Sequence, residues 1–262
     1  SSMLEQIITD SIRLAELKKW ESYAEIGIPF TPADEVDKAI RIFSVSHRKV
    51  FLKWLYRSGY YAHWISDSLF NAGLPDELVY LSMIESGFSP FAYSRASAVG
   101  LWQFIAPTAR RYDLEIDFWY DERKNPYAAT NAAIAHLDVL HGMFNNWYLA
   151  MAAYNAGSYK VRKVLKRDQV DDYWDLKSLP RETKKYVPKF LAAMHICRNL
   201  EDYGMDTLQI AKPLKFETFP VNKFLKLSTI ANSIGIPLQD LKLLNPELVR
   251  EYTRPDNKEY PL

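Results

Sequence analysis

A single glutamate, Glu85, lies where a carboxylic acid is difficult to ionise. It follows the apolar run 78–84 and precedes Gly87, a residue type that commonly ends helices. Pro75 and the acids after it predict a helix start. We therefore expect Glu85 in the last turn of a mostly buried helix, where burial and the helix dipole both raise its pKa. A carboxylic acid protonated near neutral pH suits a general acid; the alternative is a carboxylate that simply reaches solvent.

Three short motifs occur in a fixed order along the chain. Each is weak alone, but their order and spacing together are specific. The motifs are Glu85-Ser86-Gly87 at the start of 85–90, Gly100-Leu101-Trp102-Gln103 at the end of 94–103, and Ala153-Tyr154-Asn155 at the start of 153–157.

This arrangement resembles the lytic transglycosylase family with the soluble-transglycosylase (SLT) catalytic domain. The family signature is Glu-Ser, then Gly-Leu-Met-Gln about fifteen residues on, then Ala-Tyr-Asn about fifty residues further. The similarity covers roughly residues 40 to 200, and its flanks are most similar to the membrane-bound type D branch. It implies a mainly α fold with a lysozyme-like helical catalytic domain.

The resemblance also implies a reaction. The family cleaves the β-1,4 bond between N-acetylmuramic acid and N-acetylglucosamine in peptidoglycan without water. Glu85 would protonate the leaving oxygen and then act as the base, while the muramic acid C6 hydroxyl closes a 1,6-anhydro ring. One carboxylate is therefore enough, whereas ordinary glycosidases use two. The intervening acids Asp113, Asp117, Asp121 and Glu122 are interpreted as a solvated loop; the alternative is that they supply a second catalytic carboxylate.

Further cleft residues are implied by the family positions. The amides of Gln103 and Asn155 offer both donors and acceptors, which suits N-acetyl groups. Tyr154 is expected to hydrogen-bond at or near Glu85 and orient it, or else to be a half-buried core tyrosine. The other family positions near the site are Ser86, Ser94 and Tyr186.

Two of the cleft candidates carry a second interpretation. Trp102 replaces the methionine of the family motif, and its ring is either a stacking face for a sugar or an anchor in the core. Ser86 lines the site in the family, but its position equally suits the C-terminal cap of a helix.

Composition excludes several functions. The formal net charge of +1 gives no electrostatic case for nucleic acid. His136 and His141 do not share a helix face, and no metal-ligand spacing appears, so we expect neither a metal nor a cofactor. Cys197 lies in an apolar helical pattern and is expected to be a core residue. The high aromatic content of 14% suits a packed core or a sugar-binding cleft.

Residues 4–205 are predicted to be almost all helix, as the catalytic domain with an N-terminal helical extension. Apolar residues recur every three or four positions over most of this range. Asn125 and Pro126 predict a helix start, and Gly73 predicts a helix end. Helices are predicted near 52–70, 126–144, 147–153, 161–165 and 180–199, with a break at 154–157.

Residues 206–262 are predicted to form a separate small α+β module. The pattern predicts a strand at 216–219, helices at 227–234 and 238–244, and a returning strand from residue 260.

The module weakly resembles LysM, a fold that binds glycans containing N-acetylglucosamine. The resemblance rests on the two helical patterns around Gly235 and on Asn245-Pro246, whereas Asn222-Lys223-Phe224-Leu225 stands where LysM modules begin with Gly-Asp-Thr. The module is therefore either a glycan binder or a packing appendage.

The predicted function is that of a peptidoglycan lytic transglycosylase whose partner is the glycan strand. The alternatives are a goose-type lysozyme, which hydrolyses the same bond, and a non-enzymatic wall-binding protein. The substrate implies the bacterial periplasm or cell envelope, and we expect a monomer. Ser1-Ser2-Met3 is typical of a cloning remnant, so we expect any targeting segment or membrane anchor outside this chain.

Overall fold

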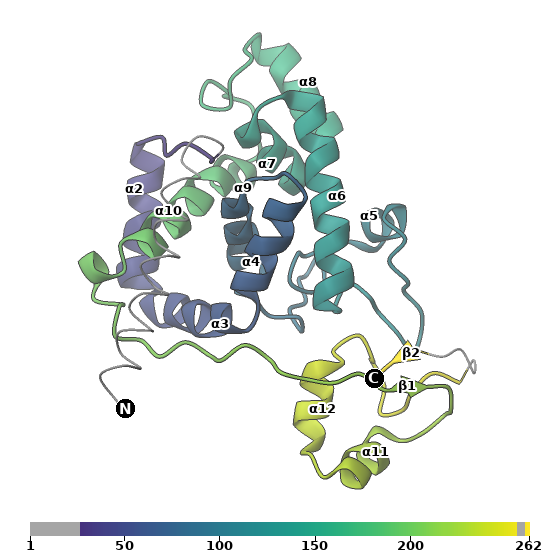
Figure 1. The fold of residues 1–262 in the computed structure, drawn as a ribbon. Helices are drawn as coiled ribbons and strands as arrows, with labels where there is room; N and C mark the ends of the chain where they lie inside the picture. Colours follow the sequence, from purple (N-terminus) through teal and green to yellow (C-terminus); the bar gives the residue numbers. More distant parts are fainter. Residues whose placement is uncertain (1–26, 256–259) are drawn as a thin grey trace.

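The computed structural model describes residues 27–255 and 260–262. A helical domain is followed by an extended segment and a small α+β module, as Figure 1 shows. The predicted fold class is confirmed. Residues 4–26, where the predicted N-terminal helical extension begins, lie outside the described residues. Within the described ranges, no helix combines the length and apolarity needed to cross a membrane.

The helical domain is built mainly from α-helices, with short π and 3₁₀ turns at its junctions. These elements are α2 (Asp34–Arg41), the π-helix η1 (Ile42–Ser46), α3 (Arg48–Asn71), the 3₁₀-helix η2 (Asp76–Leu78), α4 (Val79–Ser86), α5 (Ala106–Arg111), α6 (Pro126–Phe144), α7 (Trp147–Ala156), α8 (Ser158–Asp168), α9 (Arg181–Lys184), α10 (Tyr186–Arg198) and the 3₁₀-helix η3 (Glu201–Tyr203).

The helix that carries Glu85 forms as predicted. Gly87 ends α4 in the left-handed conformation (φ 58°), and its N–H donates to Met83 O at 2.8 Å. A side chain at Gly87 would place its Cβ 2.0 Å from the Trp54 ring. Glycine is therefore needed both for the backbone turn and for the approach of Trp54, and this fixes where Glu85 emerges.

The helices that carry the second half of the site differ from the prediction in two details. α7 continues through residues 154–156, where a break was predicted, so Tyr154 and Asn155 lie in its last turn. The helix predicted over 180–199 is split into α9 and α10. Pro188 explains the split, because its ring would clash with the carbonyl four residues earlier, at Lys184.

The module consists of a strand, two helices and a returning strand. β1 (Pro220–Val221) pairs antiparallel with β2 (Tyr260–Pro261), and α11 (Leu227–Ile234) and α12 (Leu238–Leu244) lie between them in the sequence. Both helices and the returning strand are confirmed. The first strand begins after the predicted range 216–219, so its predicted position is wrong.

The segment before the module runs along the helical domain beneath α3 (Figure 1). The N–H of Ala211 donates to Tyr56 O at 2.9 Å. A side chain at Gly59 would place its Cβ 1.9 Å from Ala211 O, so the absence of a side chain permits this contact.

The module docks on the loop that precedes α6. Backbone hydrogen bonds join Asp121 N to Glu247 O at 2.9 Å and Val249 N to Trp119 O at 3.0 Å. Tyr120 from the helical domain packs in the small core of the module. The two parts are therefore joined by a backbone ladder and a shared apolar cluster.

Candidate active site

Glu85 lies at the C-terminal end of α4 and is half-buried. Tyr186, in the first turn of α10, donates its hydroxyl hydrogen to Glu85 Oε1 at 2.6 Å. Only 5% of Tyr186 is exposed, so this hydroxyl is held in place by packing. The α4 and α10 helices together fix the position of the carboxyl group.

Burial raises the pKa of Glu85 to about 7. The hydrogen bond from Tyr186 and the charge of Lys189 lower this pKa, whereas the charge of Glu182 raises it. Desolvation disfavours the ionised form more than these neighbours stabilise it. The raised pKa predicted from the sequence is confirmed, and its main cause is burial. The carboxyl group can both give and accept a proton near neutral pH.

Tyr154 makes a different contact from the one predicted. Its hydroxyl donates to the carbonyl of Trp102 at 2.8 Å, and the hydroxyl that binds Glu85 belongs to Tyr186. The charge of Glu85 contributes to the raised pKa values of both tyrosines, so all three groups are neighbours. The expected hydrogen bond to Glu85 thus comes from Tyr186, and Tyr154 orients the adjacent loop.

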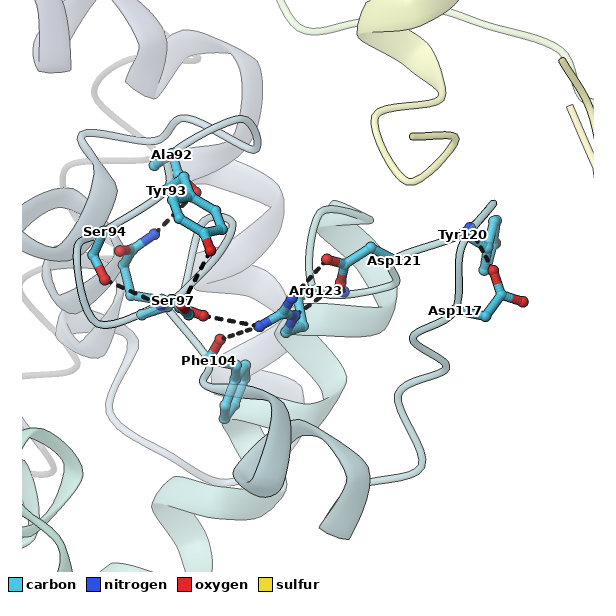
Figure 2. A network of polar contacts seen from close by, with 11 residues as sticks. Ala92, Tyr93, Ser94, Ser97, Phe104, Asp117, Tyr120, Asp121 and Arg123 are labelled. Carbon is cyan, nitrogen blue, oxygen red and sulfur yellow. Dashed lines mark hydrogen bonds and ion pairs between the residues drawn. The ribbon is translucent and has the colours of Figure 1, made fainter. Parts of the chain in front are cut away.

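The loop at 92–104 carries Gln103 and, as Figure 2 shows, Ser94. Gln103 is in the left-handed conformation (φ 51°), and its Nε2 donates to Gly100 O at 2.9 Å and to Ala92 O at 3.3 Å. Ser94 Oγ accepts from Ala98 N at 3.0 Å. Both polar side chains therefore hold the loop in shape, whatever they contact in a substrate.

Ser86 ties this loop to the helix of the glutamate. Its Oγ donates to Leu101 O at 2.9 Å and accepts from Ser89 N at 3.2 Å. Ser82, one turn earlier in α4, donates to the same carbonyl at 3.2 Å. Ser86 is thus the last residue of α4 and a structural link between Glu85 and the 92–104 loop.

Asn155 connects α7 to α9. Its Oδ1 accepts from Thr183 Oγ1 at 2.9 Å, and Thr183 is 2% exposed. Thr183 stands three residues before Tyr186, so the contact helps to align α7 with the segment that holds Glu85. Thr183 stands in the short motif around Tyr186, but its contact with Asn155 was not predicted, because residues 28 positions apart leave no local pattern.

Trp102 does not offer a sugar-stacking face. Its side chain is completely buried (0% exposed), and its indole N–H donates to Thr130 Oγ1 at 2.9 Å. Between the two interpretations of Trp102, the structure supports the core anchor. Assigning Trp102 to substrate binding is wrong, because an inward-facing ring filling the core cannot also stack on a ligand.

The acidic stretch before α6 is only partly solvated. Asp113 and Asp117 are exposed, but Asp121 is 7% exposed and forms an ion pair with Arg123 at 2.8 Å. The interpretation of this stretch as a solvated loop is therefore wrong for Asp121. The backbone N–H of Asp121 also donates to Glu247 O of the module, a contact between residues far apart in sequence that local patterns do not reveal.

Two charged residues near Glu85 were not among the predicted site residues. Glu182 in α9 and Lys189 in α10 act on the Glu85 carboxyl in opposite directions. Their proximity follows from the turn between α9 and α10. Within the described residues, no cluster of three or more His, Cys, Asp or Glu side chains could hold a metal ion.

Two families match this chain. Residues 63–177 match the Transglycosylase SLT domain, and residues 215–262 match the LysM-like domain of lytic transglycosylase MltD. The first match contains Glu85 and all three motifs.

The chain is also similar in sequence to individual lytic transglycosylases. Membrane-bound lytic murein transglycosylase D of Escherichia coli K12 is 36% identical over 190 residues, which are 71% of this chain and 42% of that protein. A putative soluble lytic murein transglycosylase of Haemophilus influenzae is 34% identical over 117 residues, 41% of this chain and 19% of that protein. The chain therefore spans less than half the length of either relative.

A solved structure with a similar arrangement is that of an inactive mutant of lytic transglycosylase Slt from Pseudomonas aeruginosa. It is 26% identical, covers 62% of this chain and 28% of its own, and superimposes with a TM-score of 0.47. With both family matches in place, the chain belongs to the lytic transglycosylase family with an SLT domain and an MltD-type LysM-like domain.

Proposed function

We propose that this protein cleaves peptidoglycan glycan strands without water, leaving 1,6-anhydro-N-acetylmuramic acid ends. In this mechanism the Glu85 carboxyl protonates the glycosidic oxygen as the bond breaks. The resulting carboxylate then takes the proton of the muramic acid C6 hydroxyl as that oxygen attacks C1. No cofactor takes part in either step.

The observation that carries the proposal is the state of Glu85. Its carboxyl is half-buried, its pKa is raised to about 7, and it receives a 2.6 Å hydrogen bond from Tyr186. A pKa close to the working pH lets one group act first as an acid and then as a base. The Tyr186 hydroxyl supports the ionised form between these two steps.

Further residues are proposed to bind the sugars beside the reacting bond. Gln103 and Asn155 can bond to N-acetyl groups, and Ser86, Ser94 and Tyr154 shape the loop and helix end around them. Contacts with the substrate that form only when the sugar ring distorts towards the transition state would increase the rate rather than the affinity for substrate.

The wider assignments follow from the same proposal. A glycan-strand substrate implies the periplasm or cell envelope as the compartment. We propose domain limits of 4–205 and 206–262, and a monomeric state in which one chain holds the complete site.

Product analysis tests the reaction directly. Purified sacculi are digested with the protein and the released muropeptides are identified by mass spectrometry. We expect anhydro ends, which are lighter by one water than the products of hydrolysis. Reducing N-acetylmuramic acid ends would contradict the proposal, and no release at all would favour a wall-binding protein.

The hydrolytic alternative gains one specific observation from the structure. A goose-type hydrolase needs a group that activates water, and Glu182 is a carboxylate close enough to raise the pKa of Glu85. A Glu182→Gln variant separates the two reactions. If Glu182 is a catalytic base, cleavage is lost; if Glu85 acts alone, cleavage continues with anhydro products.

A further inference from the structure

A buried ion pair lies between the docked module and the 92–104 loop (Figure 2). Arg123 Nε donates to Asp121 Oδ1 at 2.9 Å, and Nη2 donates to Oδ2 at 2.8 Å. The two side chains are 9% and 10% exposed. Burying two charges costs free energy that their attraction only partly returns, so stability alone is a weak reason for such a pair.

The remaining nitrogen of Arg123 reaches the loop that carries Gln103. Nη1 donates to Ser97 O at 3.1 Å and to Phe104 O at 3.2 Å, so one guanidinium bridges both ends of the 97–104 segment. The backbone also touches the loop, since a Cβ on Gly100 would lie 1.8 Å from Arg123 O.

The loop needs such support because its backbone is strained. Ser97 and Gln103 both adopt the left-handed conformation, with φ of 60° and 51°. Non-glycine residues are held there only when surrounding contacts compensate for the cost. Arg123 donates to the carbonyl of Ser97 and to that of Phe104, the residue after Gln103.

The other end of the pair is fixed by the module. The backbone N–H of Asp121 donates to Glu247 O at 2.9 Å, and Tyr120 packs against Leu227, Leu241 and Leu248. A continuous series of contacts therefore runs from the module through Asp121 to Arg123 and on to the loop.

We propose that Arg123, oriented by Asp121, is a positioning residue that holds the 92–104 loop and Gln103 in place, and that the docked module supports this arrangement. The inference rests on the proposed function of the cleft. In this proposal the module stabilises a loop of the catalytic domain, whether or not the module binds glycan.

Hydrogen exchange of the loop tests the positioning role without any substrate. An Arg123→Lys variant keeps the charge but loses the fork that bonds Asp121 and both carbonyls at once. We expect exchange of the 94–99 amides to accelerate about tenfold relative to the parent. Asp121→Asn provides a second variant with the same expected direction should the first fold poorly.

Arg48→Lys is the matched control. Arg48 also donates to backbone carbonyls, to Tyr203 O at 2.7 Å, to Gly204 O at 2.8 Å and to Ser44 O at 3.4 Å, but these lie at η3 and η1 and not in the 92–104 loop. The same substitution there is expected to leave exchange of the 92–104 loop unchanged.

Kinetics on soluble glycan strands provide a second readout. Because Gln103 is displaced while Glu85 keeps its surroundings, Arg123→Lys should raise KM about tenfold and leave the alkaline limb of kcat/KM in place. A purely structural role would lower the melting temperature and move neither the loop exchange nor KM, and that result would overturn the proposal.

A charge reversal tests the contribution of the module. Arg254 donates to Glu115 at 2.6 and 2.8 Å across the interface, so Arg254→Glu places like charges in contact there. We expect loop exchange to accelerate about threefold and the added change Glu115→Arg to reverse it. Unchanged loop exchange in Arg254→Glu would overturn the part of the proposal that involves the module.

The exchange and activity outcomes are independent. If the loop exchange responds as expected but sacculi yield no anhydro products, the proposed reaction is wrong while the positioning of the loop stands. If anhydro products form but hydrogen exchange of the loop is the same in Arg123→Lys as in the parent, the proposed reaction stands and the positioning role is overturned.

Discussion

Glu85 and Glu247 are two carboxyl groups that burial makes similarly weak acids, in different surroundings. Burial is the largest cause in both cases, and it raises the pKa of each to about 7. One lies at a helix end in the catalytic domain, and the other lies where the module docks on that domain.

The difference lies in access and in neighbours. Glu85 is half-buried and receives a hydroxyl hydrogen bond from Tyr186. Glu247 is 5% exposed, is paired with Asn125, and its Oε2 has no hydrogen-bond partner among the described residues. A raised pKa therefore reports burial in both places, and only the accessible carboxyl with a stabilising hydroxyl is equipped to exchange protons with a substrate.

Removing the two carboxylic acids in turn should give the largest contrast. Glu85→Gln is expected to lower the rate of muropeptide release from sacculi by at least about 10³-fold, because both proton transfers lose their carrier. Glu247→Gln is the matched control and should stay within about twofold of the parent. If both variants lost muropeptide release to a similar extent, the loss could not be assigned to the position of Glu85 in the candidate active site.

The two tyrosines beside Glu85 should behave differently. Tyr186→Phe removes the bond that favours ionised Glu85, so the pKa rises and the alkaline limb of kcat/KM moves to higher pH, with about a tenfold lower rate. Tyr154→Phe removes a bond to Trp102 O and should lower the rate without moving the limb. A limb shifted by Tyr154→Phe instead would reverse the assignment of the two hydroxyls.

Glu247 should govern stability rather than rate. Below the ordinary pKa of 4.5, folded and unfolded chains both hold the proton; between 4.5 and about 7 only the folded chain does. Stability is therefore lost as pH rises through this window. The Glu247→Gln variant lacks this titration, so its free energy of unfolding relative to that of the parent should be about 1–3 kcal/mol higher at pH 8 than at pH 4.5. Urea denaturation of both proteins at the two pH values measures this difference.

The exposed Glu217 provides the control for that measurement. Glu217→Gln should leave the pH dependence of unfolding unchanged, because an exposed carboxyl is solvated in both states. An equal response at the two positions would show that the pH dependence does not come from the buried interface.

The smallest expected effects come from charges near Glu85. Glu182→Gln should lower the pKa of Glu85 and Lys189→Gln should raise it, so the alkaline limb shifts in opposite directions. Rates at the pH optimum should change by about twofold or less. Shifts in the same direction would show that the substitutions act through packing.

Local patterns predicted much of this molecule. The helix before Gly87, the Asn125 cap of α6 and the two helices of the module were predicted from residues next to one another in sequence. The split between α9 and α10 was not, although Pro188 supplies its physical cause. Local signals thus located elements better than the breaks between them.

The sequence by itself determined that Glu85 ends an apolar helix, since this follows from its neighbours along the chain, and it predicted a raised pKa from the burial expected there. Only the tertiary structure decided that Tyr186 rather than Tyr154 binds it, that Trp102 faces inward, and that Asp121 is buried with Arg123. The contacts of Tyr186 with Glu85 and of Trp102 with Thr130 join residues far apart in sequence. Asp121 and Arg123 are close in sequence, but their burial is set by how the surrounding segments pack.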